Sequence, residues 1–490
     1  MNLKSLAKDT AIYGLSSIVG RFLNYLLVIL YTYTIPAESG GYGIVSNLYA
    51  WTALLLALLT FGMETTFFRF SNKADEDPER VYGTALKMVG GVAVVFLALI
   101  AFFLKPIAGA LGYSLHPEYI AIFAVITALD AFQAIMFVRL RQQRRPIKFV
   151  ALKLSFIFAS IILNLLVFLV MPRFFGRFPA LESAWQRFDY GVGFIFLINL
   201  ICTALVTFGF IPELKGLKLK FDWALCRRML AYSWPLLLLS LVGILNQVAD
   251  KILYKHLVPG HEGLVQLGIY GACAKIAMIM AMLTQAFRYA YEPIVFGASK
   301  DKNNVSTLAA GMKYYIIFTV LAFLAVIVYL PLLKHIIGSS YWEGLGVVPV
   351  VMLAELFMGV YFNLSFWYKL SDQTWWGAVM SAAGAAVMIA VNVIFVPRIG
   401  YWACAWAGLA GYGTSMLLSL VIGGSKMKVP YDVRGILGFA GLGVLIYCLH
   451  SLPVWLGANL PAWLSITYGT ILLALYGLAV LKSLKKHKEI

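Results

Sequence analysis

Long apolar segments recur along almost the whole chain of 490 residues and limit what it can fold into. A helix needs about 20 apolar residues to cross a bilayer, and segments of that length leave no room for a soluble domain between them. The chain is 61% hydrophobic and 12% charged, whereas soluble domains carry about 25% charged residues. The sequence therefore predicts an all-α polytopic membrane protein.

The predicted spans number about 14 when apolar windows of about 19 residues are used. They cover residues 10–34, 43–61, 81–103, 119–137, 149–171, 191–211, 229–254, 267–289, 314–333, 347–367, 375–396, 402–422, 436–452 and 463–481. The first span is too long for a signal-peptide core and has no small-residue cleavage site behind it. We expect it to be retained in the protein.

Positive charge is distributed unevenly between the loops that join these spans. The formal net charge is +17, and alternate loops hold far more Lys and Arg than the loops between them. Because cytoplasmic loops carry this excess in membrane proteins, both termini are predicted to be cytoplasmic. The same rule accounts for the net charge without a nucleic-acid partner.

A weak internal repeat suggests how the spans are grouped. Gly20 and Tyr31 match Gly243 and Tyr254 at one offset, and Gly43 then matches Gly268 after a short insertion. A parallel repeat of this kind predicts two six-helix lobes related by an axis along the membrane normal. We expect an N-terminal lobe at 1–212, a charged cytoplasmic linker at 213–228, a C-terminal lobe at 229–424 and an extra helix pair at 425–490.

Charged residues inside the spans are the first candidates for function, because an intramembrane charge is costly and normally faces protein or a water-filled cavity. Arg21 lies near the middle of the first span, with Asn24 one turn later. The other candidates are the cations Lys87, Lys153, Lys275 and Arg288 and the polar or acidic residues Glu64, Asp130, Asn246 and Asp250. Cations outnumber acids, and a phosphate group would suit the excess.

Other roles remain open for these residues. The charged residues could instead pair with one another, and Arg21 with Asp130 or Glu64 would then be a buried structural ion pair. Asn246 and Asp250 could cap a helix or form hydrogen bonds at its end. The acids could also bind a coupling Na⁺ or H⁺.

Motifs for enzymatic chemistry are sparse. Asp75 and Asp77 form a D-x-D pattern, but it lies in a short charged loop with no domain to hold a nucleotide. His261-Glu262 lacks the second histidine of a zinc motif, and the chain has no phosphate-binding GxxxxGK[ST] loop. The five cysteines are scattered and suggest neither a metal site nor disulfides. No metal or cofactor is predicted.

Four blocks carry a resemblance to a known family. They are GLSSIVGRFLNYLLVILYTYTIPAESGGYGIVSNLYA (14–50), FGMETTFFRFS (61–71), LNQVADKILYKHL (245–257) and GIYGACAKIAMIMAMLTQAFRYAYEPIVF (268–296). The chain resembles the Wzx-type polysaccharide-export flippases of the multidrug/oligosaccharidyl-lipid/polysaccharide exporter superfamily.

This resemblance implies two six-helix lobes around a central cavity, two further C-terminal helices, and transport rather than enzymatic activity. It implies alternating access that carries undecaprenyl-pyrophosphate-linked oligosaccharide to the outer leaflet of the bacterial inner membrane, for O-antigen, capsule or exopolysaccharide. Arg21, Lys275 and Arg288 would meet the pyrophosphate. Glu64 and Arg69 match a recurring Glu…Arg pattern with a structural or gating role, and Asn246 lies in a recurrent polar pair.

The expected partners are therefore the lipid-linked oligosaccharide, membrane lipids and the polysaccharide polymerase machinery. A lipid II flippase and a cation-coupled multidrug exporter are alternatives from the same superfamily, although the exporter would want an acidic cavity. A polytopic polymerase or acyltransferase would want a larger exterior loop than residues 172–190 provide.

Overall fold

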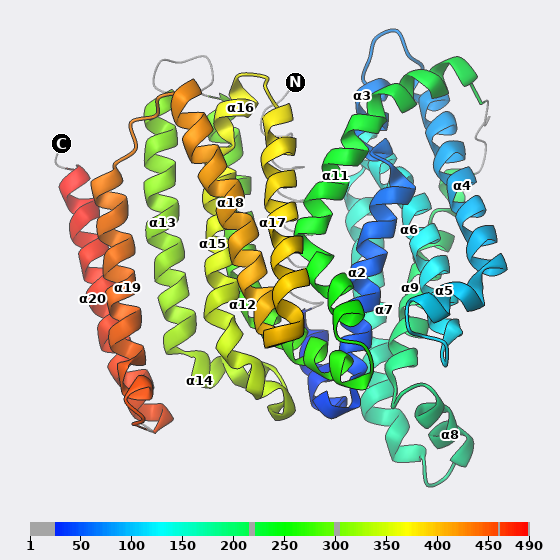
Figure 1. Ribbon diagram of the computed structural model, residues 1–490. Helices are drawn as coiled ribbons and strands as arrows, with labels where there is room; N and C mark the ends of the chain where they lie inside the picture. Colours follow the sequence, from blue (N-terminus) through cyan, green and yellow to red (C-terminus); the bar gives the residue numbers. More distant parts are fainter. Residues whose placement is uncertain (1–24, 215–220, 298–303, 459–460, 489–490) are drawn as a thin grey trace. The chain divides into compact units, whose positions relative to one another are not determined.

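The computed structural model describes residues 25–214, 221–297, 304–458 and 461–488, which are helical almost throughout (Figure 1). Among them, 13 helices are long and apolar enough to cross a membrane. A shorter apolar helix, Tyr25–Thr34, forms the end of the predicted first span, whose earlier residues lie outside these ranges. The prediction of an all-α polytopic fold with about 14 membrane helices is confirmed.

The chain divides into two compact units, Met1–Gly268 and Ile269–Ile490. The helices that lie in the first unit are η1 (Ala37–Ser39), α2 (Gly41–Thr60), α3 (Met63–Ser71), α4 (Pro78–Phe102), α5 (Leu104–Ala110), α6 (Pro117–Gln142), α7 (Pro146–Leu165), η2 (Leu166–Val170), η3 (Met171–Phe174), α8 (Pro179–Arg187), α9 (Val192–Gly209), α10 (Ile211–Leu214) and α11 (Trp223–Leu257). The next helix, α12 (His261–Gly297), begins in the first unit and continues into the second.

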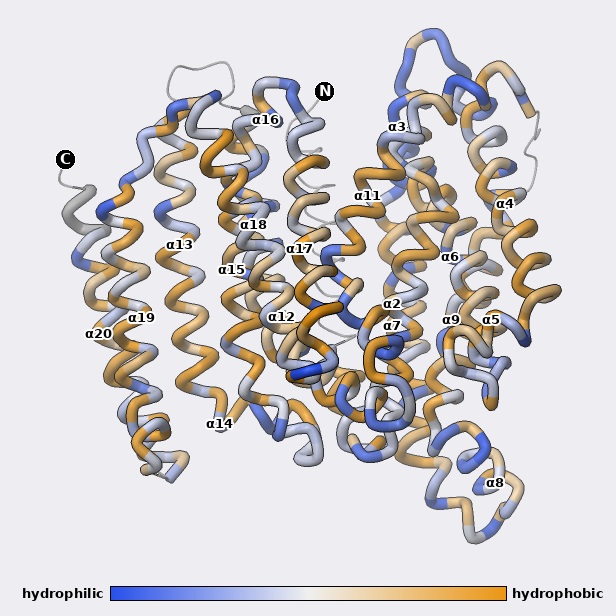
Figure 2. Tube along the Cα trace, viewed as in Figure 1, coloured by the Kyte–Doolittle hydropathy of each residue, from blue (hydrophilic) through white to orange (hydrophobic). Residues whose placement is uncertain are grey.

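The rest of the second unit consists of α13 (Asn304–Val328), α14 (Leu330–Leu333), η4 (Lys334–Ile336), η5 (Ser339–Val347), α15 (Val348–Leu364), α16 (Phe366–Leu370), α17 (Trp375–Ile399), α18 (Trp402–Lys426), α19 (Val433–Trp455) and α20 (Ala462–Lys488). In both units the long helices are mainly hydrophobic, and hydrophilic residues gather near the helix ends and in the loops (Figure 2).

The core of the first unit lies where α3, α4, α6, α9 and α11 meet. Its largest fully buried side chains include Phe67, Tyr82 and Phe210, and Met229 of α11 belongs to the same cluster. The observed boundary of the first unit differs from the predicted one. The prediction assigned residues 213–228 to a linker and residues from 229 onward to the C-terminal lobe, whereas α11 packs along α2, α3 and α4 and belongs to the first unit.

The second unit has two kinds of helix packing. α17 and α18 approach closely at small residues, since a Cβ on Gly384 would lie 2.6 Å from the backbone oxygen of Gly411. The last two helices, α19 and α20, pack on α13 and on each other. There the Tyr476 hydroxyl donates a hydrogen bond of 3.3 Å to the backbone oxygen of Ile317.

Candidate functional site

A cavity of about 500 Å³ opens between α3, α6 and α11 in the first unit. Its lining residues are Glu64, Thr65, Phe68, Arg69, Val138, Arg141 and Tyr232. Two guanidinium groups and one carboxylate therefore face a space large enough for a small ligand group. We refer to it as the α3 pocket.

A break between α2 and α3 shapes this pocket. Phe61 and Gly62 adopt positive φ values of 34° and 71°, which ends one helix and starts the next. A Cβ on Gly62 would lie 2.9 Å from Cβ of Leu236 in α11, so the approach requires glycine. Pro235 lies inside α11 beside this contact and removes one backbone hydrogen-bond donor from the helix. The two irregularities place α3 against α11.

Close packing of α3 on α11 brings a cation onto an aromatic ring. The Arg69 guanidinium carbon lies 4.1 Å from the ring centroid of Tyr232, a cation–π contact. Arg141 enters the pocket from the last turn of α6. Within the part of the chain that the structure describes, neither guanidinium has an acidic side chain within 4 Å. The pocket is therefore net positive.

Three of the predicted intramembrane residues lie near one another beside the pocket. Glu64 interacts electrostatically with Lys153 of α7 and with Arg141. Lys153 also interacts with Asp130 of α6, and its Nζ lies 4.2 Å from the ring centroid of Phe137. Charges thus extend from the α3 pocket into the helical bundle.

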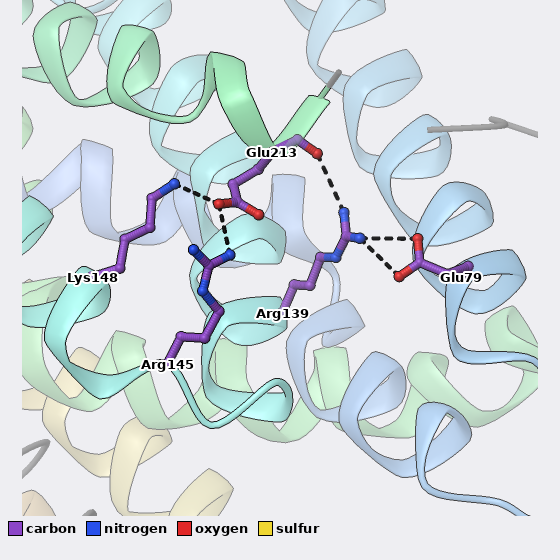
Figure 3. A network of polar contacts seen from close by, with 5 residues as sticks. All are labelled: Glu79, Arg139, Arg145, Lys148 and Glu213. Atoms are coloured by element: carbon purple, nitrogen blue, oxygen red, sulfur yellow. Dashed lines mark hydrogen bonds and ion pairs between the residues drawn. The ribbon is translucent and has the colours of Figure 1, made fainter. Parts of the chain in front are cut away.

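Ion pairs join the helix ends around the pocket (Figure 3). Arg139 donates two hydrogen bonds, of 2.8 and 2.9 Å, to the carboxylate of Glu79. Glu213 of α10 accepts from Arg145 at 2.8 Å and from Lys148 at 2.5 Å. We call this region the charged end of the first unit; it comprises the C-termini of α3 and α6, the N-termini of α4, α7 and α11, and α10.

The ion pairs with Lys148 and Arg145 change the pKa of Glu213. Burial acts to raise the pKa of Glu213, but the hydrogen bonds and positive charges of Lys148 and Arg145 outweigh it and lower the pKa below its ordinary value.

The N-terminus of α11 is attached to the same end. Asp222 caps α11 by accepting from the backbone N–H groups of Ala224 and Leu225, and it forms an ion pair with Arg80. Arg228 lies 2.6 Å from the Glu76 carboxylate. Arg80, Arg139, Arg145 and Arg228 are thus each paired with an acid, in contrast to the two arginines in the pocket.

The D-x-D loop contributes to this end as a structural turn. Asp77 caps α4 by accepting a hydrogen bond of 3.1 Å from the backbone N–H of Glu79, and Asp75 is exposed. In the described ranges no three His, Cys, Asp or Glu side chains gather as a metal site.

The second unit contains another charged cluster. Arg288 and Glu292 lie one turn apart on α12, with 3.8 Å between Nη2 and Oε1. Lys369 of α16 lies 3.9 Å from the same Glu292 oxygen. Both cations lie over the ring of Phe362 on α15, at 4.3 and 4.4 Å from its centroid.

The other predicted residues lie elsewhere. Arg21 and Asn24 fall outside the described residues. Lys87 on α4 and Lys275 on α12 are half-buried. Asn246 is buried in α11 and donates to the backbone oxygen of Val242, and Asp250 pairs with the adjacent Lys251 at 3.1 Å.

The side chains of these sites that were not among the predicted site residues include Arg141, Tyr232, Glu292 and Lys369. Arg141 lies beyond the end of the predicted span 119–137, yet α6 continues to Gln142 and carries it into the pocket. The four-residue spacing of Arg288 and Glu292 was a signal that was available, since such pairs share a helix face. Tyr232 is one aromatic among many and gave no such signal.

The fold is similar to those of two solved transporters. One structure is described as the lipid II flippase MurJ in an inward closed conformation (TM-score 0.73, 14% identity, 96% of this chain and 98% of that chain covered). The other is an inward-facing multidrug resistance MATE family transporter of the MOP superfamily (TM-score 0.64, 13% identity, 82% and 93% covered). At these identities the likeness concerns the fold. No curated protein sequence matches the chain significantly.

The sequence pattern of one family matches residues 6–294, which is more than half of the chain. Together with the shared fold, this match confirms the predicted resemblance. The chain belongs to the family of polysaccharide biosynthesis proteins and has the all-helical fold seen in MurJ and MATE structures.

Proposed function

We propose that the protein is a flippase that moves undecaprenyl-pyrophosphate-linked oligosaccharides from the cytoplasmic to the outer leaflet of the bacterial inner membrane. The cargo would serve O-antigen, capsule or exopolysaccharide biosynthesis. The observation that carries the proposal is the α3 pocket, in which Arg69 and Arg141 have no acidic partner within ion-pair distance among the described residues. Family membership supports the class of cargo.

Pyrophosphate matches the chemistry of this pocket. A guanidinium presents a planar fork of N–H donors that can bind two phosphate oxygens at once. Tyr232 supports one side of Arg69, which limits the orientations the fork can take. Glu64 leaves the pocket only moderately positive, so that an anion can bind and then leave.

Transport would then need no covalent chemistry. The sugar head group crosses through a polar path while the polyprenyl tail stays in lipid, and one half of the protein rocks against the other. In this proposal Arg21, Lys87, Lys275 and Arg288 are further cations for the cargo. Asn24, Asn246 and Asp250 are gating candidates, and Glu64, Lys153 and Asp130 are candidates for coupling to H⁺ or Na⁺.

Complementation of a gene deletion tests the proposal. Surface polysaccharide and lipid-linked repeat units are measured in cells that carry wild type, Arg69→Met, Arg69→Lys or Arg141→Met. A charge-assisted hydrogen bond is worth about 1.5–3 kcal/mol, so each Met variant should lower transport by about 10- to 100-fold and leave complete units on the cytoplasmic leaflet. Arg177→Met, at an exposed position between η3 and α8, is the matched control.

Three results would contradict the proposal. Repeat units that reach the outer leaflet but stay unpolymerised would indicate a polymerase. Normal surface polysaccharide with new sensitivity to cationic drugs would indicate a multidrug exporter. Full transport by both Met variants at normal membrane levels would exclude the α3 pocket from the path.

A lipid II flippase is the second candidate, because the MurJ structure covers 96% of this chain at the higher of the two TM-scores. Both cargoes carry the same pyrophosphate and differ in the sugar. Rescue of cells depleted of their lipid II flippase, by wild type but not by Arg69→Met, would favour this candidate.

A further inference from the structure

A smaller cavity of about 200 Å³ lies in the second unit, where α16 packs against the last turns of α18. Its wall is mainly apolar, and we refer to it as the α18 pocket. The lining residues are Leu364, Trp367, Ser419, Leu420, Gly423, Gly424, Met427, Lys428, Val429 and Tyr431. A lining of this kind favours a hydrocarbon group as ligand.

Two glycines and a tryptophan give the pocket its form. A Cβ on Gly423 would lie 2.6 Å from Cδ1 of Trp367, so the indole ring lies directly against the backbone of α18. The indole N–H donates a hydrogen bond of 3.1 Å to Oγ of Ser419, which fixes the ring as one wall. A Cβ on Gly424 would meet no atom within 4 Å, so the space beside α18 is open at this residue.

The pocket is continuous with an exposed apolar face of α18. Leu420 lines the pocket and is itself 47% exposed, and Leu417 and Val421 are 55% and 72% exposed. With Gly424 these residues have the spacing i, i+3, i+4 and i+7, which places them on one face of the helix. Exposed apolar side chains on a membrane-spanning helix face lipid. A hydrocarbon chain can therefore reach the pocket from the bilayer.

Exposed cations accompany the pocket. Lys428 lines it, and Lys426 and Arg434 flank the segment that closes it; all three are exposed. In the described ranges none of them has an acidic side chain within 4 Å. The only acid between residues 426 and 434, Asp432, pairs with Lys313 at 2.7 Å and caps α19. The charged end of the first unit differs, because four of its arginines are paired with acids.

We propose that the α18 pocket binds an acyl chain of an anionic phospholipid, whose head group is attracted by Lys426, Lys428 and Arg434. Clusters of Lys and Arg at the cytoplasmic ends of membrane helices attract anionic lipids, and the positive-inside rule predicts a cytoplasmic position for this end of α18. The inference goes beyond the proposed function, since its ligand is a resident lipid of the bilayer and not the transported cargo.

Photocrosslinking of the full-length purified protein tests this site. Phosphatidylglycerol and phosphatidylcholine, each with a diazirine near the end of one acyl chain, are compared at equal amounts, and labelled peptides are identified by mass spectrometry. Each nearby Lys or Arg strengthens the binding of an anionic lipid about fivefold. Phosphatidylglycerol should therefore label residues 417–431 at least fivefold more strongly than phosphatidylcholine does. Lys426→Gln, Lys428→Gln and Arg434→Gln together should make the two lipids equal.

Gly424→Leu tests the pocket itself, because its side chain would occupy the open space beside α18. Leucine also favours a helix more than glycine does. Exclusion of two methylene groups already weakens binding about tenfold, so label from both lipids should fall by at least that factor. Gly438→Leu is the matched control, since a Cβ on this exposed glycine of α19 also meets no atom within 4 Å. It should keep the full label.

A thermal unfolding assay checks that each variant is folded, and the triple Gln variant decides the question if Gly424→Leu is not. Equal labelling of wild type by the two lipids, or full labelling of folded Gly424→Leu, would overturn the proposal. An unlabelled segment 417–431 in wild type would also overturn it and leave the pocket to a protein partner. Displacement of the label by less polyprenyl monophosphate than phosphatidylglycerol would assign the pocket to the cargo instead. Since no residue of the α3 pocket is changed, failure here would not affect the proposed flippase function.

Discussion

Neighbouring arginines at the charged end of the first unit have different electrostatic partners. Arg139 and Arg145 donate to Glu79 and Glu213, whereas Arg141 lies in the α3 pocket with no acid within 4 Å in the described residues. Helical geometry explains the difference between Arg139 and Arg141, because residues two apart on α6 point in directions about 160° apart. One arginine joins helices, and the other faces the cavity.

Glu213 provides a prediction about pH at the residue scale. Burial acts to raise the pKa of Glu213, but Lys148 and Arg145 outweigh it, so the pKa is lowered in the folded protein. A carboxylate with a lowered pKa stabilises the folded protein fully at pH values above the ordinary glutamate pKa of about 4.3. This stabilisation is lost as the pH falls through the pKa that the group has in the folded protein. Glu213→Gln should therefore lower the unfolding free energy by about 1.5–3 kcal/mol at pH 7.

Thermal unfolding in detergent between pH 7 and pH 3 measures this effect. The difference between wild type and Glu213→Gln should shrink below about pH 4.3 as the carboxylate is protonated. Glu182→Gln, at an exposed position on α8, should show no difference at any pH. A difference that persists unchanged at pH 3 would show that the ion pairs are not its cause.

At the element scale, α11 is attached to the first unit at both ends. At its N-terminus, Asp222 pairs with Arg80 and Arg228 pairs with Glu76. Near its C-terminus, the Asn47 amide donates to the backbone oxygen of Lys251 at 2.8 Å, and Nζ of Lys255 lies 2.9 Å from the ring centroid of Tyr113. Pro235 lies between these attachments, where a missing backbone hydrogen bond makes bending easier.

The break between α2 and α3 can be tested by one substitution. Gly62→Ala forces a side chain into a positive-φ conformation and against Leu236. We expect a loss of about 1–3 kcal/mol in unfolding free energy and a lower pyrophosphate affinity, because α3 carries Arg69. Thermal unfolding and equilibrium dialysis measure the two effects.

Gly91→Ala is the control, since a Cβ at Gly91 on α4 would meet no atom within 4 Å. It should be neutral or stabilise the protein by up to about 1 kcal/mol. If Gly62→Ala proved as stable as Gly91→Ala, the break would not be what positions α3.

At the scale of the whole molecule, one pair of residues from the predicted repeat can be located in the structure. Gly43 and Gly268, which the repeat pairs, pack against each other: a Cβ on Gly268 would lie 3.0 Å from the backbone nitrogen of Gly43. A Cβ on Gly43 would in turn collide with the backbone of Leu264.

The predicted orientation of the chain is testable at the same scale. The positive-inside rule predicts that the charged end of the first unit is cytoplasmic. In a cysteine-free background, a cysteine at Asp75 should react with a membrane-impermeant maleimide only after the cells are permeabilised. A cysteine at Arg177 should react in intact cells. The reverse pattern would place the α3 pocket at the outer leaflet and contradict cytoplasmic loading.

The amino-acid sequence by itself determined the fold class and the approximate number of membrane helices, because hydrophobic length is a local property of the chain. Its residue pattern also identified the family. It also singled out Glu64 and Arg69, which share one pocket, and Lys153 and Asp130 beside it. Only the tertiary structure decided which charges are neutralised. Arg141, Tyr232 and Lys369 join their sites through contacts between helices far apart in sequence, and the distances and burial that set electrostatic energies exist only after those helices pack.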